Sequence, residues 1–111
     1  MLLILPCVAA GEPLAIELVR ASLKRDQQTG QPVITVVMTP ACGRAFTDLT
    51  ARNVGKAFEF RIDGRAVMKP VIREPILGGT ALISGVDADE ARALAERLSS
   101  GAGRFEVEVV E

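Results

Sequence analysis

Cysteine and carboxylate side chains are the groups in this sequence best suited to chemistry, because the chain contains no histidine. It therefore lacks the side chain that most often acts as a general base or a zinc ligand near neutral pH. Cys42 lies at the predicted beginning of a helix, a position that can lower the pKa of a thiol. An unreactive small residue is the simpler interpretation of Cys42. The composition therefore argues against catalysis.

Acidic side chains could in principle form an acid–base pair or a metal site. The candidates are Glu59, Asp63, Glu74, Asp87, Asp89 and Glu90. Their predicted positions are an exposed strand face, a turn, a loop and the start of a helix, where each has an ordinary structural role. The stretch "DADE" opens a helix and does not match a calcium-binding loop. We therefore predict no catalytic residue, no metal and no cofactor.

The adjacent glycines Gly78 and Gly79 are a candidate phosphate-binding loop. Such a loop opens directly onto a helix and is ideally followed by lysine and serine or threonine. Here the glycines precede a predicted strand, "TALISG", and no lysine follows. A tight connection between two strands is the better interpretation.

The length and charge of the chain restrict its class. Its 111 residues fit one domain, which needs no metal or disulfide to fold. The net charge is -1, and the four phenylalanines are the only aromatic residues. A nucleic-acid binder normally carries a basic stripe or stacking aromatics, so that class is not expected.

Apolar periodicity predicts six strands. They cover residues 14–26, 33–39, 58–62, 66–72, 80–85 and 105–109. Asp63-Gly64 is a strong hairpin signal between the third and fourth strands. Pro70 lacks a backbone donor, so the fourth strand should lie at an edge or form a bulge around Lys69 and Pro70.

Two amphipathic helices complete the fold. The first follows Thr39, a suitable N-cap, and should end at Gly55; the second lies between Asp87 and Gly101. The resulting order, ββαβββαβ, predicts an α+β domain. We expect a ferredoxin-like two-layer sandwich, a mostly antiparallel sheet with two helices on one face.

The first ten residues resemble a secretory signal peptide. An apolar run ends in small residues, with Val8 and Ala10 before an expected cut at Gly11, although no positively charged region precedes the run. We therefore expect residues 1–10 to be removed and residues 11–111 to form one exported domain without stable membrane insertion. A first strand of the fold is the alternative for residues 1–10. Removal would leave Cys42 as a lone thiol with no disulfide framework.

The stretch "NVGKAFEFRIDGRAVMKPVIREPILGGTALISG", followed by "DEARALAERLSSGA", resembles the head subdomain of the first periplasmic domain of SecD. SecD is a subunit of the bacterial Sec preprotein translocase. The resemblance covers residues 26–103, but the family's "SGA" continues into Leu-Pro, where this chain reads "SGAGRFEVEVVE". It implies a periplasmic, non-enzymatic module that contacts emerging preproteins.

The resemblance leaves two functions open. One is a periplasmic or secreted module that binds unfolded polypeptide or a protein partner. The other is an accessory subunit that docks on the Sec translocon or another envelope complex without client affinity. An enzyme that uses Cys42 or a carboxylate is a third, weaker alternative.

For the first function, the exposed edge beside Pro70 is a candidate site for strand addition. Its residues are Val71, Ile72, Ile76, Leu77, Gly78 and Gly79. An edge merely protected by Lys69, Pro70 and Arg73 is the alternative.

Overall fold

The computed structural model describes residues 7 and 13–110. Its elements follow the order βββαβββαβ. They are β1 (Leu14–Ile16), β2 (Leu18–Arg25), β3 (Pro32–Met38), α1 (Pro40–Arg52), β4 (Phe58–Ile62), β5 (Arg65–Met68), β6 (Thr80–Ile83), α2 (Ala88–Ser100) and β7 (Phe105–Val109). The α+β class is therefore confirmed, with one strand more than the sequence pattern suggested.

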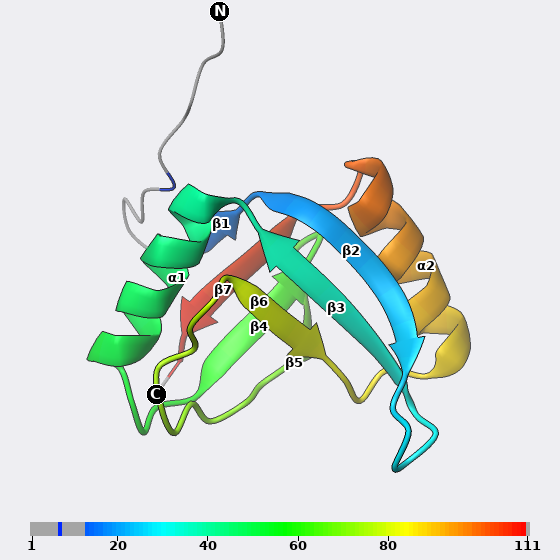
Figure 1. The fold of residues 1–111 in the computed structure, drawn as a ribbon, viewed down its shortest axis with the longest axis horizontal. Helices are drawn as coiled ribbons and strands as arrows, with labels where there is room; N and C mark the ends of the chain where they lie inside the picture. Colours follow the sequence, from blue (N-terminus) through cyan, green and yellow to red (C-terminus); the bar gives the residue numbers. More distant parts are fainter. Residues whose placement is uncertain (1–6, 8–12, 111) are drawn as a thin grey trace, which may run out of the picture.

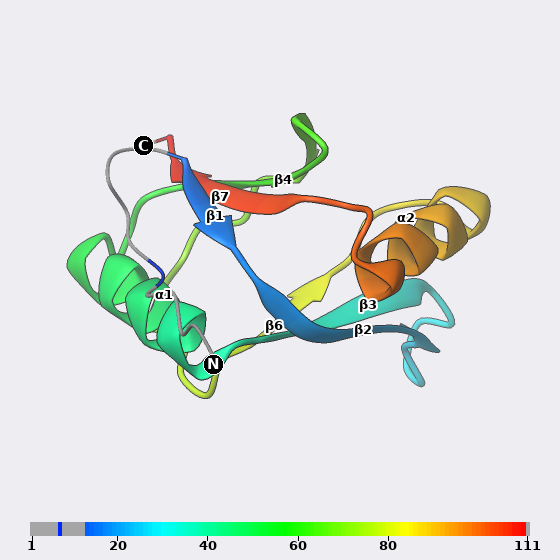
Figure 2. The same cartoon turned by 90° about the horizontal axis from the view of Figure 1, so that it is seen from above.

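The strands form two antiparallel sheets rather than the single sheet expected from the sequence. One sheet has the order β1-β7-β4-β5 and the other the order β2-β3-β6. Figure 1 shows α1 and α2 at opposite sides of the strands, and Figure 2 shows the two sheets one above the other between the helices. The helices therefore close two ends of the molecule and do not share one face of a sheet.

The second sheet arises because the predicted strand over residues 14–26 is interrupted at Glu17. Before the break, Leu14 pairs with Val107 of β7; after it, Ala21 pairs with Val36 of β3. The chain thus crosses from one sheet to the other. Both strands turn apolar residues to the same core, since Leu14, Ile16 and Ala21 are all buried.

The core joins both sheets and both helices in one cluster of buried apolar residues. Phe60 of β4 lies at its centre, in edge-to-face contact with Phe46 of α1 and Phe105 of β7, at centroid distances of 6.2 and 5.8 Å. Such aromatic pairs stabilise beyond the area that they bury. They fix α1 against the four-stranded sheet.

The predicted helix caps are confirmed at three positions. The side chain of Thr39 accepts a hydrogen bond from the Cys42 N–H, and Asp87 accepts one from the Glu90 N–H. Gly101 ends α2 in the left-handed conformation, with φ 85°. The expected stop of α1 at Gly55 is wrong, because α1 ends at Arg52, where the Asn53 side chain donates to the Leu49 carbonyl.

The Asp63-Gly64 hairpin is confirmed, and both residues have positive φ, as a tight hairpin turn requires. The strand that follows is shorter than predicted. It ends at Met68, and beyond Pro70 only an isolated bridge joins Val71 to Ala57. The stretch from Pro70 to Gly79 is therefore a loop that leads into β6, not a strand with its connection.

Candidate functional site

Of the first two residues of the predicted edge, Ile72 packs into the core beneath the loop and Val71 does not. Ile72 is buried; its N–H donates to the Lys56 carbonyl at 3.0 Å, and its carbonyl accepts from the Gly55 N–H at 2.7 Å. Val71 remains half exposed. Ile72 therefore anchors the loop to the turn after α1 and is not accessible to a partner.

Ile76 is attached to α1 through two threonine side chains. The Thr50 hydroxyl accepts from the Ile76 N–H at 3.0 Å and donates to the Thr47 carbonyl at 2.9 Å. The Thr47 hydroxyl donates to the Ile76 carbonyl at 2.8 Å. Thr50 is fully buried, so water cannot replace it as a partner for the Ile76 N–H. These bonds hold the loop against the helix.

Gly79 approaches α1 so closely that the backbones touch. A Cβ atom added at Gly43 would lie 3.1 Å from the Gly79 Cα atom. The Gly79 carbonyl also accepts a 2.8 Å hydrogen bond from the Met38 N–H at the end of β3. Gly78 and Gly79 both have positive φ, which glycine adopts without strain. They form a tight connection, as expected, but one that joins the loop to a strand and packs on a helix.

A groove of about 590 Å³ opens where α1, the end of β3 and the Gly78–Gly79 turn meet. Its lining is mostly apolar or backbone. The lining residues are Met38, Thr39, Pro40, Gly43, Arg44, Thr47, Asp48, Ala51, Gly78 and Gly79. Leu77, directly before the turn, is 71% exposed. The groove contains only two of the predicted site residues, Gly78 and Gly79.

Sequence patterns missed the contribution of α1 to this site. Gly43 reduces helix propensity, yet it lies within a helix beside Cys42 and Arg44. A glycine inside a helical pattern often marks a close approach of another backbone, and this was the signal available for Gly43. Thr47 and Thr50 gave no such signal, because their partner lies 26 or more residues away.

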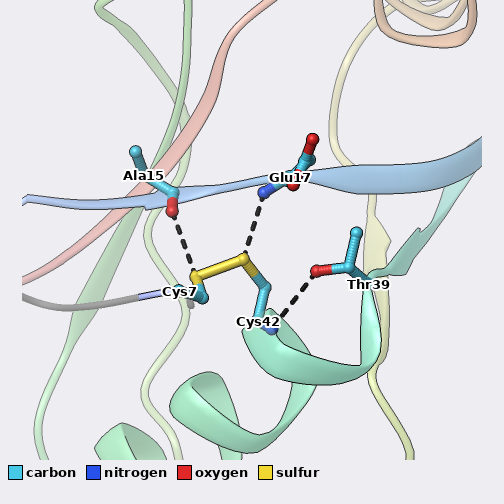
Figure 3. The surroundings of a disulfide bond; sticks show 5 residues. All are labelled: Cys7, Ala15, Glu17, Thr39 and Cys42. Carbon is cyan, nitrogen blue, oxygen red and sulfur yellow. Dashed lines mark hydrogen bonds between the residues drawn. A yellow bond between two sulfur atoms is a disulfide. The ribbon is translucent and has the colours of Figure 1, made fainter. Parts of the chain in front are cut away.

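A disulfide joins Cys42 to Cys7, with the two Cα atoms 4.7 Å apart (Figure 3). The Glu17 N–H donates to the Cys42 Sγ atom at 3.3 Å, and the Cys7 Sγ atom lies 3.3 Å from the Ala15 carbonyl oxygen. The lone Cys42 thiol was expected only after removal of residues 1–10; with Cys7 present, Cys42 is disulfide-bonded and has no thiolate to act as a nucleophile. Apart from Cys7, the predicted signal peptide (residues 1–10) and its cleavage site before Gly11 lie outside the described residues.

Five of the six candidate carboxylates have structural partners and do not share a common site. The Arg97 guanidinium donates to Asp63 at 2.7 Å and the Arg104 N–H at 3.0 Å, and these two bonds lower the pKa of the Asp63 carboxyl. A hydrogen bond from Arg61 lowers the pKa of Glu59.

At the start of α2, Asp87 is its N-cap and Glu90 pairs with Arg65. Asp89 lies 4.0 Å from Arg92, and Glu74 is exposed in the loop. Over the part of the chain that the structure describes, no three acidic or cysteine side chains gather as metal ligands would.

This fold and its sequence match a known family of translocase domains. Residues 12–102 match the family described as the SecDF P1 head subdomain, and the chain belongs to that family. It is 44% identical over 85 residues to the protein translocase subunit SecD of Dictyoglomus turgidum, covering 76% of this chain and 21% of that protein. With SecD of Acetobacter pasteurianus the identity is 40% over 96 residues, or 86% of this chain and 18% of that protein.

Solved structures of SecDF also match this chain. A structure of SecDF, described as a membrane component that enhances protein export, matches with a TM-score of 0.72 and 35% identity over 86% of this chain and 43% of that one. The chain thus spans about a fifth of the length of the SecD relatives that it matches. Among residues 7 and 13–110, the structure has no helix that is both long and apolar enough to cross a membrane.

Proposed function

We propose that this chain is a non-catalytic module of the bacterial envelope that binds unfolded or partly folded polypeptide during protein export. The observation that carries the proposal is the mainly apolar groove between α1 and the Gly78–Gly79 turn, in a member of the SecDF P1 head family. Concave apolar sites with few polar groups are the usual place for ligands on a small domain. The exposed Leu77 beside the turn adds an apolar contact.

The disulfide supports the cellular location in this proposal. Disulfides form and persist in oxidising compartments such as the periplasm and are rare in the cytosol. The bond between Cys7 and Cys42 therefore fits an exported, periplasmic or secreted protein. A disulfide-bonded Cys42 and carboxylates engaged in ion pairs and helix caps likewise fit a binding role better than an enzymatic one.

Photo-crosslinking in living cells tests the proposal. A photoreactive amino acid is placed at Leu77, and for the control at Leu23, an exposed leucine that lines a different hollow, beside α2. We expect many different exported chains on the probe at Leu77 and few at Leu23. One dominant envelope protein would instead support a docking subunit of the Sec translocon or another complex. Equal, sparse capture at both positions would contradict both functions.

A further inference from the structure

β6 is a terminal strand whose outer edge has no neighbouring strand in the described structure. It pairs with β3 alone, through Val37 and Thr80 at one end and Ile34 and Ile83 at the other. The Met38 N–H bonds to the Gly79 carbonyl, so Gly79, Ala81 and Ile83 occupy the hydrogen-bonded positions opposite β3. The backbone groups of Thr80 and Leu82 must therefore point outward.

A contact at the far end of the strand supports this alternation. Ser84, two residues after Leu82, donates its N–H to the Sδ atom of Met68 at 3.3 Å. Met68 thus covers the outward donor at the end of the edge. Among the described residues, the N–H and carbonyl groups of Thr80 and Leu82 have no backbone hydrogen-bond partner outside β3, and both residues are exposed.

β6 also lacks the usual protection of an edge strand. In natural proteins, charged side chains or proline on an edge strand prevent another strand from pairing with it. β5, the terminal strand of the other sheet, has this protection in Arg65 and in Lys69 and Pro70 just beyond its end. By contrast, residues 75–86 carry no charge, and Leu77 and Leu82 are 71% and 56% exposed.

We propose that the outer edge of β6 binds an extended segment of a foreign polypeptide as an added β-strand, and that the segment continues into the α1 groove. Unpaired donors and acceptors alternating along a strand fit an extended backbone. A strand beside Thr80 that runs on past the start of β6 reaches Gly79 and Gly78, which line the groove. The proposal rests on the function proposed above and replaces the edge beside Pro70 with that of β6.

The charges at the groove define the occupant further. Asp48 is paired with Arg52 at 3.0 Å, whereas Arg44, also a lining residue, has no ion-pair partner among the described residues. The groove therefore favours a segment with apolar side chains and one acidic group, a glutamate, an aspartate or a terminal carboxylate, that pairs with Arg44. The bound segment is neutral or apolar along β6 and negative beside α1.

Amide hydrogen exchange on the unaltered protein tests the site directly. The probe is a fluorescent synthetic peptide of about ten residues, long enough to extend past the four-residue β6, with alternating valine and threonine and one glutamate near an end. We expect the peptide to slow exchange at the Thr80 and Leu82 amides and to leave unchanged the amide of Leu23, which by the same alternation points outward from β2 at the opposite edge of the sheet. One peptide is N-methylated at its odd-numbered residues and a second at its even-numbered residues. Only one of the two should lose binding, because only every other amide of an added strand faces β6. Binding without protection at Thr80 and Leu82, or equal binding of the two N-methylated peptides, would overturn the proposal.

Variants of the edge and the groove give a second test by fluorescence anisotropy. Leu82→Pro removes an outward donor but no bond to β3, so affinity should fall about tenfold, while Leu82→Ala, which keeps the donor, falls less. Arg44→Glu should weaken binding about threefold to tenfold, and a peptide with lysine in place of its glutamate should restore it. If Leu82→Pro does not fold, the two N-methylated peptides still decide the question.

The outcomes also separate this proposal from the function on which it rests. Capture of many chains at Leu77 that persists in a Leu82→Lys variant would keep the polypeptide-binding function and reject the β6 edge. Sedimentation of the protein alone tests the other occupant, a second copy of this chain paired through β6. A dimer abolished by Leu82→Lys would reject the foreign segment as the occupant.

Discussion

The two ends of the molecule each hold a helix, but by different means. At the α2 end, polar side chains connect the helix to its surroundings. Asp87 caps the helix, and the Arg97 guanidinium donates to Asp63 at 2.7 Å and to the Ala102 carbonyl at 3.2 Å. Glu90 pairs with Arg65. These groups are largely exposed, and each contributes little by itself. The α2 end is therefore closed by several weak polar contacts at the surface, beside the buried apolar residues Ala91, Ala95 and Leu98.

The α1 end is held by fewer, more deeply placed contacts. Besides the packing of Phe46 on Phe60, they are the Cys7–Cys42 disulfide, the buried Thr50 hydroxyl and the backbone contact between Gly43 and Gly79. Small residues at this junction leave a groove that no side chain of residues 13–110 fills. The comparison suggests that the deep contacts at the α1 end let the protein keep an open apolar surface there without loosening the helix.

Removal of the disulfide should have the largest effect on stability. The bond closes a sequence separation of 35 residues, for which chain entropy predicts a contribution of about 3–4 kcal/mol to the free energy of unfolding. We expect the double variant Cys7→Ser, Cys42→Ser to lose about that amount in urea unfolding. A reductant should destabilise the natural protein and leave the variant unaffected.

The same bond makes a prediction about processing. Cleavage before Gly11 would discard Cys7 and free Cys42, which is 3% exposed. We therefore expect the folded, oxidised protein purified from the periplasm to retain Cys7, and its intact mass to lie about 2 Da below that of the reduced form. A mature chain that begins at Gly11 would show that the disulfide is absent in the cell and that the signal-peptide prediction holds.

Thr50→Val should have the next largest effect. The change leaves the Ile76 N–H without its partner beneath a fully buried side chain, at a cost of about 1–3 kcal/mol. The matched control is Thr47→Val, which removes the bond to the Ile76 carbonyl from a partly exposed side chain, so the loss should be smaller. Urea unfolding measures both, and limited proteolysis should cut faster near Leu77 in Thr50→Val. Equal losses in the two variants would contradict the special role of Thr50.

Local chemistry explains which parts of this fold the sequence predicted. Thr39, Asp87 and Gly101 each act on a backbone group three residues away, so the caps could be recognised from a few neighbouring letters. The Asp63-Gly64 turn is equally local. The break at Glu17 is not local, because it depends on β1 pairing with the distant β7, as in the pair of Leu14 and Val107.

The site was less predictable than the fold for the same reason. Gly78 and Gly79 were recognised as a turn, but the helix that completes the groove lies more than 25 residues earlier in the chain. The disulfide was missed because Cys7 was assigned to a segment expected to be removed, although two cysteines are an even number and can pair.

Substitution of one glycine at each end of the molecule sharpens the comparison of the two ends. Each change should alter the free energy of unfolding by about 1 kcal/mol or less. At Gly43, alanine should gain up to about 1 kcal/mol of helix propensity but lose it to the 3.1 Å approach to Gly79, so stability should change little. At Gly101, nothing lies within 4 Å of an added Cβ, but φ is 85°, so alanine should cost about 1 kcal/mol. Chemical denaturation measures both. A clearly stabilised Gly43→Ala would show that the contact with Gly79 yields easily.

The smallest effect is expected at the α2 end, from Asp63→Asn, and it should appear as a change in pH dependence. The hydrogen bonds from Arg97 and from the Arg104 N–H lower the pKa of Asp63 in the folded protein. A lowered carboxyl pKa gives stability that is present above the unfolded value, about 3.9, and is lost as the pH falls through the folded value. Asparagine tolerates the positive φ of 55° at this position, so the change isolates the charge.

We therefore expect the unfolding free energy of Asp63→Asn to fall less steeply below about pH 4 than that of the natural protein. Glu59, whose pKa is also lowered by Arg61, keeps part of the acid dependence in both proteins, so only the difference between the two curves reports on Asp63. Adding salt should shrink the difference near neutral pH, because the ion pair with Arg97 is half exposed. Parallel acid curves would mean that the exposed network at α2 contributes nothing measurable, and that backbone caps and apolar packing hold this end.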